Sequence, residues 1–187
     1  TAITDVSQPY HGIELKYMYD MVQALGAKRA LIKFAVGGTA LAQGAGADWS
    51  PTSSSELYST ILSYWNTART NALKQGFILT PKAFIFYQGE ADAQNLTWAN
   101  AYEANLTAFI TKVRTDFALT KFVICKVHNI AAYTYSSTVR AAQDSVAASD
   151  ADVDIISTDS YEPTVVHPNS ASYNSIGADV ANVVKLY

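Results

Sequence analysis

Four short apolar runs alternate along this chain with longer segments that repeat apolar residues at helical spacing. The apolar runs are rich in β-branched and aromatic residues, as in buried strands, and cover residues 29–36, 82–88, 121–127 and 153–158. The helical segments cover residues 13–25, 54–75, 99–117, 137–148 and 175–186. Strands that are apolar on both faces predict a parallel sheet, because right-handed crossovers place helices on each face. The sequence therefore predicts a three-layer α/β/α domain.

Composition limits the partners of this domain. The chain has 187 residues, of which 49% are hydrophobic and 16% charged, a balance that predicts a single domain over residues 1–187. Its net charge is −3 with scattered Lys and Arg, so we expect no nucleic-acid partner. No apolar run approaches the roughly 20 residues that span a bilayer, so we expect a soluble protein without a membrane partner. Abundant Tyr, Ser, Thr and Asn suggest an extracellular or virion-surface location.

Metal and thiol chemistry have little support in the sequence. Cys125 is the single cysteine and lies in the apolar run FVICKV, so we expect a buried thiol rather than a reactive one. The three histidines, His11, His128 and His167, lack the mutual spacing of metal ligands. We therefore predict no metal and no cofactor.

Unusual residues follow two of the predicted strands, at the sheet edge where ligands of open α/β sheets bind. Gly37 and Gly38 would let backbone amides approach a ligand and stabilise an oxyanion, although, taken alone, such a pair is more often a tight turn. Gln88 offers two amide donors, and Glu90 could orient a histidine. Helix capping is the alternative for Glu90 and its neighbours, but it does not explain a Gln at a strand end.

His167 lies in the loop before the last helical segment, where an imidazole can act as a general base. A lone loop histidine is more often an ordinary surface residue. His128 and His11 compete for the role, but His128 ends a predicted strand and His11 precedes a helix, so each has a structural explanation. His167 is therefore the candidate base.

Five blocks occur in an order and spacing that resemble one family. They are HGIEL (11–15), LIKFAVGGTAL (31–41), FYQGEAD (86–92), VRAAQ (139–143) and a late HPN (167–169). Together they resemble the SGNH hydrolases, and within them the sialate-O-acetylesterase and acetyl-xylan-esterase branch. The resemblance implies a flavodoxin-like sheet and a serine esterase that removes O-acetyl groups from an acetylated carbohydrate. A lipase or thioesterase of the same superfamily is a weaker alternative.

The resemblance also implies roles for individual residues. Gly38 would supply the backbone amide of the oxyanion hole and Gln88 its side-chain amide, with His167 as general base and Glu90 as its carboxylate partner. The family usually has an aspartate three residues before that histidine, but Thr164 stands there in this chain. The nearest acids are Glu162 and Asp159, which makes Glu90 the better partner. The expected substrate-binding residues are Gly37, Thr39, Trp49 and Tyr161.

The family's nucleophile motif, GQSN at the end of the first strand, is absent from the chain. In a flavodoxin-like sheet that strand is central, between those ending in GGT and QGE, so its loss would leave buried backbone groups unpaired. We therefore expect a fold that lacks or borrows its first strand, supplied by an N-terminal segment or a partner chain. Alternatively, residues 2–6 form a short substitute strand and Ser7 is the nucleophile. A different function is a catalytically inactive esterase-fold module for glycan binding or particle assembly.

Overall fold

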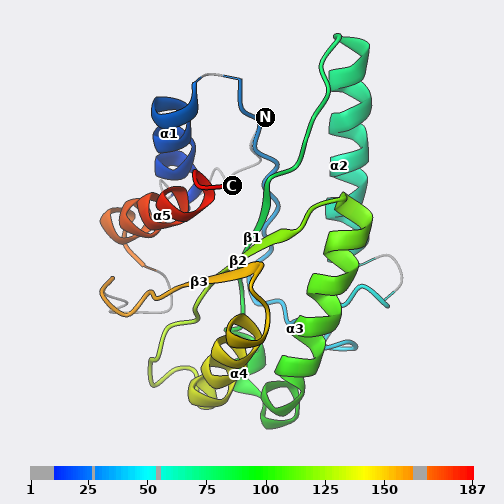
Figure 1. The fold of residues 1–187 in the computed structure, drawn as a ribbon. Coiled ribbons are helices and arrows are strands. Elements are labelled where there is room, and N and C mark those ends of the chain that lie inside the picture. Colours follow the sequence, from blue (N-terminus) through cyan, green and yellow to red (C-terminus); the bar gives the residue numbers. More distant parts are fainter. Residues whose placement is uncertain (1–10, 27, 54–55, 162–167) are drawn as a thin grey trace.

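The strands form one parallel sheet in sequential order, and helices cover both of its faces (Figure 1). The computed structural model describes residues 11–26, 28–53, 56–161 and 168–187. Within them the strands are β1 (Ala83–Tyr87), β2 (Lys121–Cys125) and β3 (Val153–Ile156). The helices are α1 (Glu14–Leu25), α2 (Leu57–Lys74), α3 (Leu96–Phe117), α4 (Ser136–Ser149) and α5 (Ser170–Val184), with a short 3-10 helix, η1 (Asp92–Gln94). The predicted α/β/α class is confirmed.

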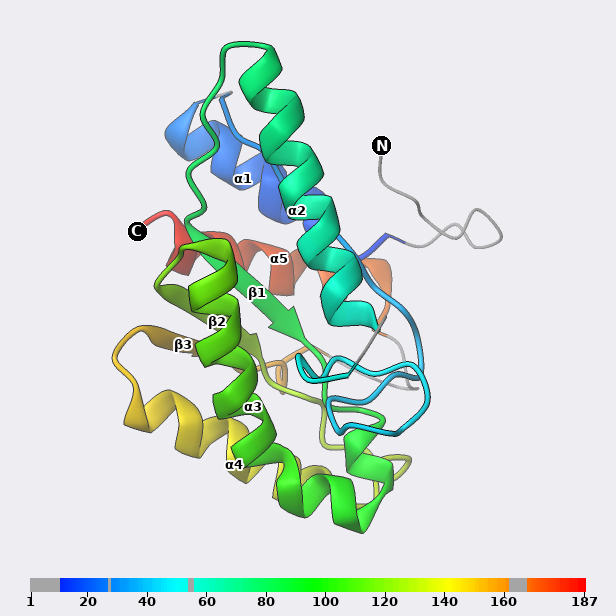
Figure 2. The same cartoon turned by 90° about the vertical axis from the view of Figure 1, so that its right-hand side faces the viewer.

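Side chains alternate between two hydrophobic cores along β1 because successive residues of a strand point to opposite faces. Phe84 and Phe86 face α3, where their ring centroids lie 5.7 and 4.6 Å from that of Phe109. Ile85 and Tyr87 face the other way and pack into the core formed with α1 and α5. Figure 2 shows α3 in front of the sheet and α5 behind it. Burial on both faces explains why the strands are apolar throughout.

The strand predicted over residues 29–36 is wrong. This segment has no strand structure, and its side chains are half-buried or exposed. Phe34 still packs in the core, with its ring centroid 5.5 Å from those of Trp49 and Tyr64. A strand requires hydrogen bonds to a neighbouring strand, and in the described part of the chain β1 pairs with β2 alone. One edge of β1 is therefore unpaired among these residues, which agrees with a sheet that lacks a strand.

Helix ends follow local capping chemistry. The side chain of Asn95 accepts hydrogen bonds from Thr97 N and Trp98 N, so α3 begins before the predicted residue 99. Asn169 similarly accepts from Ser172 N at 2.9 Å and starts α5 before the predicted residue 175. Gly76 has a φ of 79° beyond the end of α2, as a left-handed cap requires.

Candidate active site

The GGT and QGE loops meet at the carboxyl end of β1. Gln88 follows β1 directly, and its side-chain Nε2 donates to the backbone oxygen of Thr39 at 3.1 Å. Gly38, the residue before Thr39, has a φ of 71°, as expected for a glycine turn, and both glycines of the motif are exposed. The sequence placed both motifs at this edge, and the structure brings them into direct contact.

Asp92 joins the two loops from inside the protein. Its side chain is completely buried at the start of η1. Its carboxylate accepts hydrogen bonds from Gln88 Nε2 at 2.6 Å, Leu41 N at 2.8 Å and Ala42 N at 3.1 Å. Burial raises the pKa of Asp92, although these three donors oppose the shift. Asp92 is therefore a cross-link between distant loops rather than the helix cap that the sequence allowed.

Two further buried side chains hold Gln88 in place. The Tyr102 hydroxyl donates to the side-chain Oε1 of Gln88 at 3.1 Å and to its backbone oxygen at 3.0 Å. Gln143 Nε2 donates to the same backbone oxygen at 3.2 Å, while its Oε1 accepts from Val127 N at 3.0 Å. Gln143 thereby links the ends of β1 and β2. Every polar atom of the Gln88 side chain has a partner within the chain.

Gly89 is required by the close packing beneath this site. Its φ is 138°, a conformation that side chains with a Cβ rarely adopt. A Cβ there would lie 3.0 Å from Val139 Cγ1, 3.3 Å from the Tyr102 hydroxyl and 3.4 Å from Val127 Cβ. The glycine of the QGE motif therefore lets the chain turn while α3 and α4 approach closely.

Glu90 is the site's unusual acid. It is half-buried, and no side chain of the described residues donates a hydrogen bond to its carboxylate. Burial, helped by the negative charge of Asp92, raises the pKa of Glu90 to about 7. The carboxyl group is therefore poised to change charge near neutral pH.

Two buried polar atoms near the carboxyl ends of β1 and β2 lack partners among the described residues. Tyr87 Oη and His128 Nε2 are buried without a hydrogen bond in the described structure, and the ring centroids lie 6.2 Å apart. Burial raises the pKa of Tyr87, and the charge of Glu90 adds to the shift. Burial lowers the pKa of His128, which favours a neutral imidazole. Burial agrees with a structural role for His128.

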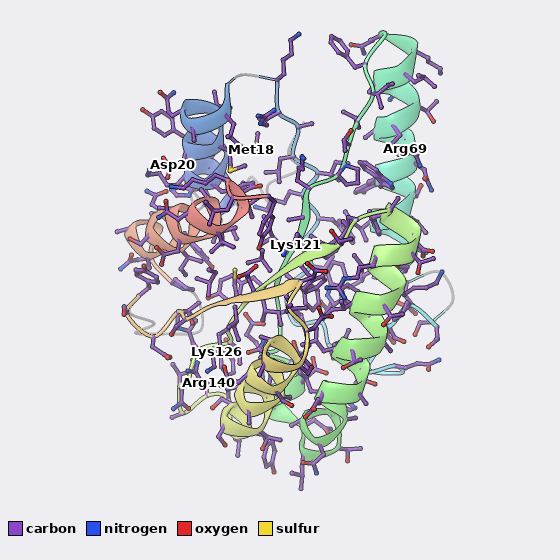
Figure 3. All side chains as sticks on the ribbon, in the orientation of Figure 1. Met18, Asp20, Arg69, Lys121, Lys126 and Arg140 are labelled. Carbon is purple, nitrogen blue, oxygen red and sulfur yellow. The ribbon has the colours of Figure 1, made fainter. Side chains whose placement is uncertain are left out.

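Asp159, one of the alternative acids, is already paired. Arg140 reaches from α4 to this end of the sheet (Figure 3) and donates to the backbone oxygen of Val127 and to Asp159 at 2.7 Å. Burial raises the pKa of Asp159, but the hydrogen bonds from Arg140 and Ser157 outweigh this effect and hold the pKa below its usual value. Asp159 is therefore less available than Glu90.

The candidate substrate-binding residues differ in exposure. Trp49 is only 6% exposed and donates from its indole nitrogen to Thr39 Oγ1 at 2.9 Å, so it is packed under the GGT loop. Tyr161 is half-buried after β3, and its hydroxyl donates to Asp179 of α5. Further candidates, namely Ser7, Glu162, Thr164 and His167, lie outside the described residues.

Nearly the whole chain matches one known protein family. A family model described as carbohydrate esterase, sialic acid-specific acetylesterase, matches residues 5–185. The chain belongs to this family. Membership of the sialic acid-specific acetylesterase family confirms the predicted kinship and supports carbohydrate acetylesterase activity in general.

A solved structure supports the same fold. A protein from Arabidopsis thaliana superimposes with a TM-score of 0.77 and 21% sequence identity, and the match covers 97% of this chain and 72% of that one. At this identity the likeness concerns the fold alone. No curated protein matches the chain.

The described residues were also compared with the features of membrane spans and metal sites. No helix among them combines the length and the apolar character needed to cross a bilayer. No group of three or more His, Cys, Asp or Glu side chains in these ranges is arranged to hold a metal ion.

Proposed function

We propose that this protein is a serine esterase that removes O-acetyl groups from carbohydrate. The observation that carries the proposal is the contact between the GGT and QGE loops, where Gln88 Nε2 lies 3.1 Å from the Thr39 oxygen. This contact gathers a glycine-turn amide, a carboxamide and the carboxylate of Glu90 at one sheet edge. Such a set suits acyl transfer, which needs fixed donors for an oxyanion and an acid to support a histidine.

In the proposed reaction a serine oxygen attacks the acetyl carbonyl carbon, and His167 takes the serine proton. The backbone amide of Gly38 and the side chain of Gln88 stabilise the tetrahedral oxyanion. The bond to the sugar oxygen then breaks, and His167 returns the proton to the departing sugar hydroxyl. Water, deprotonated by His167, attacks the acyl-enzyme in turn and releases acetate and the free serine.

Glu90 is the proposed carboxylate partner of His167. Burial raises its pKa to about 7, and no cation among the described residues opposes this shift. An imidazolium within about 4 Å would favour the ionised carboxylate, and the two charges would stabilise each other as the reaction proceeds. Asp159 is less suited because Arg140 already binds it.

The nucleophile is proposed to arrive with an added strand. Backbone groups on the free edge of β1 are unpaired among the described residues, and each buried, unpaired group costs about 1–3 kcal/mol. An extra strand parallel to β1 removes that cost and ends beside the QGE motif, where a serine would face Glu90. We propose that a polypeptide segment outside residues 1–187, preceding them or on a partner chain, supplies it; residues 2–6 with Ser7 are the alternative.

Substrate contacts are proposed for the exposed rim of the site. Gly37, Thr39 and the half-exposed ring of Tyr161 would contact the sugar, since aromatic rings pack against sugar faces. Trp49 could contribute only if the GGT loop opened, because its indole is buried and bonded to Thr39.

One observation favours a second function, an inactive module that binds glycan or builds an assembly. Both hydrogens of Gln88 Nε2 are already engaged, one by Asp92 and one by Thr39. An active site must turn one of them toward the substrate. A binding module would leave them as they are.

Acetate release from an acetylated glycan separates the two functions. The esterase account predicts turnover by the native material, loss of most of it in His167→Gln, and nearly full turnover in His11→Gln, the matched control. The one hydrogen bond of the His11 side chain among the described residues joins its ring to the backbone oxygen of the neighbouring Gly12. Glycan binding without acetate release would instead establish the inactive module.

A further inference from the structure

Asp92 has a role that none of the chemistry above assigns. It is a fully buried carboxylate with three N–H donors, two from the GGT loop and one from Gln88. The loop residues lie about fifty positions earlier in the chain, at Leu41 and Ala42. A buried carboxylate is costly unless hydrogen bonds satisfy it. Asp92 is therefore stable in the core only while Leu41, Ala42 and Gln88 stay within hydrogen-bonding distance of it.

The geometry of Gln88 shows what this contact achieves. A carboxamide nitrogen carries two hydrogens that lie in the plane of the amide and point in different directions. The shorter bond, 2.6 Å, goes to Asp92, and the longer one, 3.1 Å, goes to the Thr39 oxygen. A flipped amide would place Oε1 against the Asp92 carboxylate and the Thr39 carbonyl oxygen, which are both acceptors, so these two partners fix the amide orientation. With one hydrogen held by Asp92, the other points at the GGT loop.

We propose that Asp92 is a positioning residue that fixes both halves of the oxyanion hole, the Gln88 amide and the GGT loop. This inference rests on the proposed esterase function. The second Gln88 hydrogen is the one that changes its partner: it leaves the Thr39 oxygen and binds the substrate's oxyanion. Asp92 touches no reacting atom and acts through its three partners.

Asp48 offers a matched control. It is also a buried carboxylate of this loop, 1% exposed, and accepts from Gly44 N, Ser50 N and the hydroxyl of Ser53. It makes no contact with Gln88 among the described residues. Asp92→Asn and Asp48→Asn each replace a buried acceptor oxygen by a donor, so they disturb the loop comparably while differing in contact with the site.

The first readout is nuclear magnetic resonance, which requires no activity. In the wild type, the two Nε2 hydrogens of Gln88 should be distinct and at least one should exchange slowly with solvent. Asp92→Asn should abolish this protection and that of Leu41 and Ala42, whereas Asp48→Asn should expose Gly44 and Ser50 alone. Rapid exchange of both Gln88 hydrogens in the wild type would overturn the proposal, even if Asp92→Asn fails to fold.

The second readout is the kinetics of acetate release. Asp92→Asn should lower kcat by about 10- to 100-fold with little change in KM, the cost of a mispositioned catalytic group. Asp48→Asn should change kcat by less than about threefold, since it leaves that group in place. Combining Asp92→Asn with Gln88→Ala should lower kcat by less than the product of the two single losses, because part of the effect of Asp92 acts through Gln88. Equal kcat losses in the two Asn variants would refute the positioning role.

The two proposals fail in different ways. If the wild type does not hydrolyse acetyl esters but Gln88 is protected as described, the esterase function is wrong and Asp92 holds the loops for another purpose. If the wild type is active and Asp92→Asn keeps its kcat, the esterase stands and the positioning role is wrong.

Discussion

Glu90 should make the protein less stable as the pH rises toward neutrality. Its usual pKa of 4.5 applies in the unfolded chain, whereas burial raises the pKa to about 7 in the folded protein. Between these values the folded state binds more protons than the unfolded state. The free energy of unfolding therefore decreases as the pH increases through this range and levels off above pH 7.

The size of the effect follows from the same shift. Each pH unit across which one proton separates the two states is worth about 1.4 kcal/mol, so Glu90 should cost about 2–3 kcal/mol between pH 4.5 and 7.5. Glu90→Gln removes this cost, because a neutral amide resembles the protonated acid. The difference in unfolding free energy, variant minus wild type, should thus grow with pH.

Urea denaturation at half-unit pH steps measures this difference directly. Glu103→Gln is the comparison variant, because Glu103 is an exposed acid of α3 hydrogen-bonded to Ser145 of α4. A constant difference for Glu90→Gln would refute the reasoning, and one that shrinks with pH would mean that a cation stabilises the ionised carboxylate in the folded protein.

Two other predictions concern packing at the same sheet edge. Gly89→Ala should destabilise the protein by about 2–6 kcal/mol in urea denaturation, because strained backbone and overpacking each cost about 1–3 kcal/mol. Gly37→Ala is the control and should show almost no loss of stability, since a Cβ there meets open space. Cys125 should resist a thiol reagent until the protein unfolds, because it is fully buried and burial, with the charges of Glu90 and Asp179, raises the pKa of its thiol to about 12. Modification of the folded protein at the rate of a free thiol would contradict this.

Periodicity predicted three strands and the helices well because these elements bury faces that their own sequence encodes. The same signal failed for residues 29–36, whose apolar run resembles a strand but finds no partner in the described structure. A strand is a relation between two segments, so a single run cannot establish it. The helix starts at Asn95 and Asn169 depended on single side chains, which periodicity does not reveal.

The candidate site was predictable in part. The position of Gln88 after a buried strand brought it to the sheet edge, and the glycine turn was evident from the sequence. The role of Asp92 was not, because its partners lie far away in the chain. Its place in the QGEAD block was the available signal, as the place of Gln143 in the VRAAQ block was for its bond to Gln88. Tyr102, which also binds Gln88, lies in none of the five blocks. Trp49, which the sequence offered as a substrate-binding residue, is buried instead.

The most direct test of the esterase account is to locate the nucleophile. Native material, with every polypeptide that purifies with it, should be treated with a fluorophosphonate and the labelled peptide identified by mass spectrometry. The account predicts label on one serine of a segment outside residues 1–187, with acetate release lost in proportion to labelling. Label on Ser7 would place the nucleophile within this chain, and acetate release that persists without any labelled serine would contradict the serine mechanism.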